Sequence, residues 1–155
     1  MSDECLTVLE REVLEKLLTG DNSQLEILRN QLTNATVSSR EFTGVGFFAN
    51  FHVPPDMVRL SNRKRLTIGD IAANIEGLKH GAGFLLFIDD GVLEFLEGFT
   101  YDETWPEKIE NFKLTYLEEK PRGSGRLQPS SSRDMEFAPK DIDDTQHYDS
   151  ARSTH

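Results

Sequence analysis

Apolar residues recur at helical spacing in the first third of the chain. The repeated positions are Leu9, Val13 and Leu17, then Leu25, Leu28 and Leu32. These stripes predict two amphipathic helices. Thr7 and Glu10 match a capping box at the start of the first helix, and Gly20 fits its end. Asn22 or Ser23 can cap the second. The short link predicts an antiparallel helical hairpin.

From residue 36 onward the pattern changes to short apolar runs and alternation, which is typical of strands. Strands are expected at Thr36–Phe42, Val45–Val53, Leu66–Ile75, Phe84–Ile88, Val92–Phe99 and from Phe112 to Tyr116. The Leu66–Ile75 stretch also admits a helical turn. Asp90-Gly91 suits a tight hairpin, because Gly accepts positive φ at little steric cost. Thr104 and Glu107, with Pro106 between them, indicate a further helix of one or two turns.

The pattern as a whole predicts an α+β fold, with the N-terminal two-helix hairpin packed on a mainly antiparallel sheet of about five or six strands. Phe84–Ile88 is apolar on both faces, which is typical of a central strand covered on both sides. The helical hairpin covers one face. Three candidates remain to cover the other face of the sheet: a sheet that curls on itself, the loop around Met57–Leu60, or a second copy of the chain.

Residues 1–120 are expected to form a single α+β domain. From Pro121 the composition shifts to Gly, Ser, Pro and polar residues, so residues 121–155 are expected to form a flexible polar tail.

The chain is acidic, with a formal net charge of −10 over 155 residues. Most of this excess lies before residue 121. Such a domain repels nucleic acid and anionic membrane and attracts basic partners, although solubility alone also accounts for it. One cysteine, Cys5, excludes an internal disulfide and a cysteine-based zinc site. No apolar run has the length of a membrane span, and the N-terminus does not resemble a signal peptide. A cytoplasmic location is therefore expected.

The connection after Val92–Phe99 is the first candidate site. Aromatic and charged side chains in a connection are typical of recognition surfaces. The candidate partner-binding residues are Tyr101, Asp102, Glu103 and Trp105. The alternative is that Trp105 only anchors the short predicted helix onto the sheet.

A second candidate is a pocket formed by His52, Asn50 and Glu97. His52 and Asn50 share one face of their strand. Glu97 either points toward an apolar face beside Phe95 and Phe99, where burial would raise its pKa, or is a solvated residue at the sheet edge, which is the favoured interpretation. His52 is likewise favoured as a partly exposed structural residue.

Residues 44–49 match the GxGxxG/A string of dinucleotide sites, but they lead into a strand-like aromatic run, so a hairpin turn and a β-bulge are the favoured interpretation. The sequence contains no local metal motif or nucleophile elbow, so no catalytic residue, metal or cofactor is predicted.

The segment Leu96–Pro106, LEGFTYDETWP, resembles a segment of small uncharacterised bacterial proteins in which a late strand ends in LEG(F/Y)TY and Trp-Pro follows. The resemblance implies a small bacterial α+β protein and brings no activity or site. Bacterial immunity proteins that neutralise toxins share the small, acidic, α+β type without a common motif.

Three functions follow as hypotheses. The leading one is a non-catalytic protein-binding module, immunity-like or regulatory, that meets a basic partner. The second is an enzyme or small-ligand binder with a pocket near His52 and Glu97. The third is a structural homodimer that pairs through the second sheet face.

Overall fold

The computed structural model describes residues 5–134 of the chain. It begins with two helices, α1 (Val8–Leu17) and α2 (Ser23–Asn34). The predicted capping box closes α1: the Glu10 amide donates to Thr7 Oγ1 at 3.1 Å and the Thr7 amide donates to Glu10 Oε1 at 2.9 Å. Asn22 caps α2 by accepting from two amides of its first turn. Both helix starts therefore lie where the sequence predicts them.

Within residues 5–134, seven antiparallel strands form one sheet in the order β1-β2-β5-β4-β3-β6-β7. They are β1 (Thr36–Phe42), β2 (Gly46–His52), β3 (Leu66–Ile75), β4 (Ala82–Asp89), β5 (Val92–Thr100), β6 (Phe112–Glu119) and β7 (Leu127–Ser130). The α+β class with N-terminal helices is confirmed, with seven strands in place of five or six. Asp90 and Gly91 both have positive φ and make the predicted hairpin between β4 and β5.

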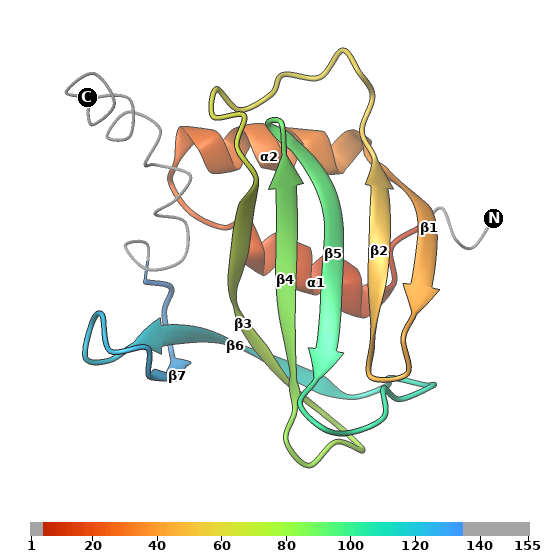
Figure 1. Ribbon diagram of the computed structural model, residues 1–155, viewed down its shortest axis with the longest axis vertical. Helices are drawn as coiled ribbons and strands as arrows, with labels where there is room; N and C mark the ends of the chain where they lie inside the picture. Colours follow the sequence, from red (N-terminus) through yellow and green to blue (C-terminus); the bar gives the residue numbers. More distant parts are fainter. Residues whose placement is uncertain (1–4, 135–155) are drawn as a thin grey trace.

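Both helices lie on the same side of the sheet, behind the strands in Figure 1. The alternation along β2 separates the two faces, because Phe47 and Ala49 are buried toward the helices while Phe48 and Asn50 point the other way and are half-buried. The core between helices and sheet includes Leu14, Leu17, Leu28, Phe84, Leu86 and Leu96. We call the side of the sheet that carries no helix the open face.

The loop that follows β2 does not cover the open face. Leu60 is fully buried in the core on the helix side, and the Gln31 side chain of α2 donates to the Val58 carbonyl. The loop around Met57–Leu60 thus packs beside α2. The structure therefore excludes this loop as the element that covers the second face of the sheet, which was one of the three candidates from the sequence.

The short helix predicted after Thr104 is wrong. Residues 104–111 contain no helix, and the Trp105 amide donates instead to the Gly44 carbonyl in the β1–β2 turn. The chain leaves β5 and passes β4 and β3 to reach β6. The hydrogen bond to Gly44 and the packing of Trp105 on Phe47 tie the segment to the sheet, and local helix signals do not show such tertiary contacts.

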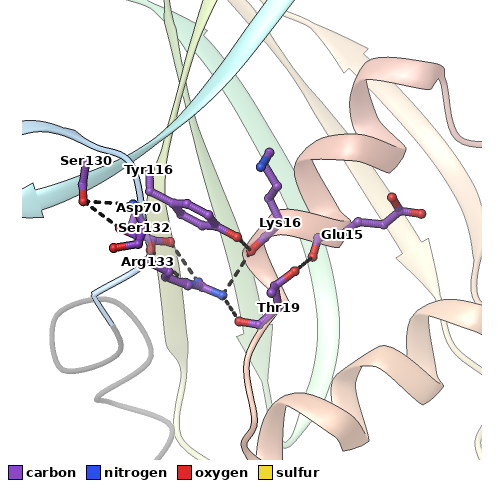
Figure 2. Close-up of polar contacts among 8 residues, drawn as sticks. All are labelled: Glu15, Lys16, Thr19, Asp70, Tyr116, Ser130, Ser132 and Arg133. Atoms are coloured by element: carbon purple, nitrogen blue, oxygen red, sulfur yellow. Dashed lines mark hydrogen bonds and ion pairs between the residues drawn. The ribbon is translucent and has the colours of Figure 1, made fainter.

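The fold continues past the domain end expected at residue 120. β7 lies within the segment expected to be a flexible tail, and it pairs with β6 from Tyr116↔Ser130 to Glu119↔Leu127. Arg133 then packs onto α1 and β3 through the contacts shown in Figure 2. The last part of the expected tail, residues 135–155, lies outside the described residues.

Candidate functional site

The predicted binding loop divides into two exposed residues and two structural ones. Tyr101 is 59% exposed, and Asp102 is also exposed. The Glu103 carboxylate accepts from the Lys79 amide at 2.9 Å and from the His80 amide at 2.8 Å. These two hydrogen bonds hold the Glu103 pKa below its usual range, because they stabilise the ionised form. Glu103 therefore fixes the turn between β3 and β4.

Trp105 is the other structural residue of that loop. Its ring is half-buried and makes edge-to-face contacts with Phe47 at 5.2 Å and Phe84 at 6.4 Å between ring centroids. Such contacts add stability beyond the area they bury. The side chain thus anchors the β5–β6 connection to the core, although residues 104–111 contain no helix of the kind that the alternative interpretation placed there.

The predicted pocket of His52, Asn50 and Glu97 is not assembled as one site. All three lie on the open face, but Glu97 pairs with Phe48, four residues before His52 along β2. That spacing corresponds to roughly 13 Å. The Asn50 amide group donates to Ser39 Oγ and Glu41 Oε2 on β1. His52 is exposed at the end of β2, so only Glu97 stands among apolar neighbours.

A cluster of apolar side chains occupies the middle of the open face. It consists of Phe48, Leu85, Phe87, Phe95, Phe99 and Tyr101, which we call the aromatic face. Phe87 and Phe95 stack at 4.4 Å, and Phe95 meets Phe48 edge-to-face at 5.5 Å. Apart from the exposed Tyr101 these side chains are half-buried. Five of the six come from β2, β4 and β5, three neighbouring strands at the front of Figure 1, and Tyr101 directly follows β5.

Gly83 makes room for one end of this cluster. It lies opposite Phe99 in the β4–β5 pairing, and a Cβ atom at Gly83 would come within 2.6 Å of the Phe99 ring. Phe99 in turn contacts the Tyr101 ring at 5.6 Å. The missing side chain thus lets the Phe99 ring lie against Gly83 of β4, and the Phe99 ring continues the apolar surface as far as Tyr101.

Glu97 lies at the centre of the aromatic face. Its direct cross-strand neighbours are Phe48 on β2 and Leu85 on β4, and Phe95 and Phe99 flank it along β5. Partial burial among these side chains raises the Glu97 pKa above its usual range. The structure thus places Glu97 beside Phe95 and Phe99 in an apolar setting, which was the less favoured of the two interpretations.

Arg65 borders the aromatic face. Its guanidinium lies 5.3 Å from the Phe87 ring centroid and 5.8 Å from that of Phe95. The same group pairs with Glu94 at 3.0 Å. The rings of the aromatic face can therefore hold a guanidinium against them, an arrangement that favours a cation electrostatically.

A pocket of about 560 Å³ opens on the helix side, between the first turn of α1, β1 and the loop before β6. Phe42 and Trp105 contribute to its walls together with Glu10 and Arg40. Arg40 makes a two-point contact with Glu10 at 2.7 and 2.9 Å and also donates to the Cys5 carbonyl. This charged pair ties α1 to β1, so its polar groups serve the fold.

A buried charged cluster lies where the end of α1 meets β3 and β6 (Figure 2). Arg133 donates to both oxygens of Asp70 at 2.9 Å, and to the carbonyls of Lys16 at 3.1 Å and Thr19 at 2.7 Å. The Tyr116 hydroxyl donates to the same Lys16 carbonyl. Burial raises the Asp70 pKa, and Arg133 opposes that rise. These groups satisfy one another, so the cluster is a structural clamp.

Sequence reasoning missed Phe48 and Phe87 as parts of a site. The signal for them was present, since Phe84–Ile88 is apolar in both directions and Phe48 alternates with buried Phe47. What the sequence lacked was the strand order, which brings β2 and β4 to either side of β5.

No helix within residues 5–134 is long and apolar enough to span a membrane. Across that same part of the chain, no three His, Cys, Asp or Glu side chains cluster in a way that could hold a metal ion. Comparison of the sequence with protein-family models and curated proteins, and of the structure with solved structures, gives no match.

Proposed function

We propose that this chain is a non-catalytic protein-binding module and that its aromatic face is the binding surface. The observation that carries the proposal is the apolar surface of β2, β4 and β5 on the side opposite the helices. Contiguous apolar patches of this kind on a folded domain mark interaction sites. Aromatic side chains are enriched where such contacts contribute most to binding.

The composition of the open face supports binding over catalysis. Its central ionisable group, Glu97, is separated from His52, so a general acid and base are not brought together. The groups that the sequence placed in the binding loop are partly used by the fold, because Glu103 holds a turn and Trp105 packs in the core. Tyr101 and Asp102 remain exposed at the end of the aromatic face and extend the proposed surface.

The test is capture of a partner from the native cell extract with tagged full-length protein. The variant Phe87→Ser, Phe95→Ser removes two rings of the aromatic face. Phe42→Ser is the matched control, because Phe42 is 72% exposed and lies on β1 at the other side of the sheet. Circular dichroism and urea denaturation verify that each variant is folded.

A stoichiometric protein that binds the wild type and the control but not the double variant would support the proposal. Retention of that protein by the double variant would overturn it. Sedimentation of the purified chain addresses the homodimer: a mass of two chains that falls to one chain in the double variant would identify a second copy as the occupant.

A further inference from the structure

Glu97 differs from the other glutamates whose contacts shape this fold. Glu10 is paired with Arg40, Glu94 with Arg65, and Glu103 accepts two backbone amides. Within residues 5–134, no hydrogen bond or ion pair reaches the Glu97 carboxylate. It stands among four apolar neighbours and is half-buried before any partner is bound.

Any protein that covers the aromatic face would remove the remaining water from this carboxylate. A wholly apolar partner would leave it buried and unpaired, which is costly because an ionised group loses its hydration without compensation. A basic side chain in the partner removes that cost by pairing with it. Removing one member of a desolvated charge pair at an interface weakens binding at least about thirtyfold, because the other charge is left buried and unpaired.

A second copy of the chain meets this requirement poorly. The basic group that borders the face, Arg65, is already paired with Glu94 and lies over Phe87 and Phe95. A copy placed face to face would also bring a second Glu97 to the interface. Each of the two chains would carry a formal net charge of −10. The same charge attracts a basic protein over longer distances.

We propose that the aromatic face binds a segment of another protein in which an arginine or lysine, flanked by apolar side chains, pairs with the Glu97 carboxylate. This inference rests on the proposed function and names the chemistry of the partner. Arginine fits best, because its planar guanidinium can pair with the carboxylate in two-point fashion while lying against the neighbouring rings. Arg65 shows that rings of this surface accept such stacking.

The experiment uses a phage-displayed library of random dodecapeptides, selected on the full-length chain. Four proteins are compared: the wild type, Glu97→Gln, Phe95→Ser and Glu110→Gln. Glu110 is exposed in the loop before β6 and borders the helix-side pocket, so it is the matched control for loss of one negative charge. Urea denaturation establishes that all four are folded.

The wild type and Glu110→Gln are expected to enrich peptides that carry an arginine or lysine next to apolar residues. Glu97→Gln is expected to lose this preference for a basic residue. An enriched peptide should bind Glu97→Gln at least about thirtyfold more weakly than the wild type. Replacing its basic residue by alanine should weaken binding to the wild type by a similar factor and leave binding to Glu97→Gln nearly unchanged.

The outcomes separate the two proposals. Peptides that need Phe95 but show the same basic preference on Glu97→Gln would overturn the pairing with Glu97 and leave the binding face in place. Peptides that bind Phe95→Ser as well as they bind the wild type would overturn the binding face itself. An absence of any enrichment on the wild type would overturn both.

Discussion

Arg133 and Asp70 are 63 residues apart in the chain and form a two-point ion pair inside the protein, with both contacts at 2.9 Å. Asp70 is 0% exposed. Removing one member of a buried pair leaves the other charged without a partner, which costs about 3–5 kcal/mol. We therefore expect Arg133→Ala to lower the free energy of unfolding by that amount, as measured by urea denaturation.

Arg126→Ala is the control for this change, because Arg126 is exposed in the turn before β7. It should leave the free energy of unfolding within about 0.5 kcal/mol of the wild type. The double variant Asp70→Leu, Arg133→Met should lose less than the two single variants together, since it removes both charges. Additive losses would contradict a direct interaction between the two side chains.

The elements that the sequence predicted well are those whose signal lies within about ten residues. The helix stripes, the Thr7–Glu10 capping box and the Asp90-Gly91 turn are all local patterns, and each corresponds to an observed element. Arg133 gave no such signal, because its partner Asp70 lies on a strand reached only through the folded sheet. The polar composition around it therefore indicated a tail.

The candidate site was predictable only in part, for the same reason. The sequence showed that Phe84–Ile88 needs cover on two sides, and the described part of the chain has helices on only one of them. It could not show that Phe48 and Leu85 flank Glu97, because that depends on β5 lying between β2 and β4. Glu103 looked like a recognition residue because its two amide donors lie more than 20 residues away.

Gln31 is a buried polar side chain that links α2 to the loop and to the β4–β5 hairpin. Its amide nitrogen donates to the carbonyls of Val58 and Gly91, and its oxygen accepts from the Leu93 amide, each at 2.9 Å. Gln31→Leu would leave the Leu93 amide without this acceptor, at about 1–3 kcal/mol for a buried group. It would also remove one donor from the Val58 carbonyl and one from the Gly91 carbonyl, which keeps the Leu60 amide. We expect a loss on the order of 3 kcal/mol in urea denaturation. Asn30→Ala is the control, because Asn30 lies on the exposed side of α2, and it should change the free energy of unfolding little. An equal loss in Asn30→Ala would show that the composition of the helix, and not the contacts of Gln31, causes the loss.

Glu103 should titrate below the ordinary glutamate value. Its pKa is lowered because the Lys79 and His80 amides donate to the ionised carboxylate. The stability it contributes is present above the unfolded-state pKa and is lost as the pH falls through the folded-state pKa. NMR titration of the Lys79 and His80 amide shifts should give a midpoint below the usual value. Glu103→Gln should abolish that titration, and a midpoint at or above the usual value would contradict the role of the two hydrogen bonds to Glu103.

Glu97 should show the opposite behaviour. Burial raises the pKa of Glu97. The contribution of Glu97 to folding stability is therefore most favourable below its unfolded-state pKa and is lost as the pH rises through its folded-state pKa. Glu97→Gln should match the wild type at acidic pH and become more stable than the wild type as the pH approaches neutrality. Urea denaturation across this range measures the difference. Glu110→Gln should show no such rise; equal profiles for the two variants would mean that Glu97 is not buried enough to matter.

The order of strands in the sheet has a consequence for how the chain folds. β3, β4 and β5 are successive in sequence and adjacent in space, whereas β2 reaches β5 and β6 reaches β3 only across longer separations. Because closing long loops costs entropy before contacts compensate for it, we expect the three-stranded meander to assemble before the outer strands join. In stopped-flow kinetics, Leu86→Ala in β4 should mainly slow folding, and Leu114→Ala in β6 should mainly speed unfolding. The surface that we propose for binding would then be largely in place at the rate-limiting step of folding.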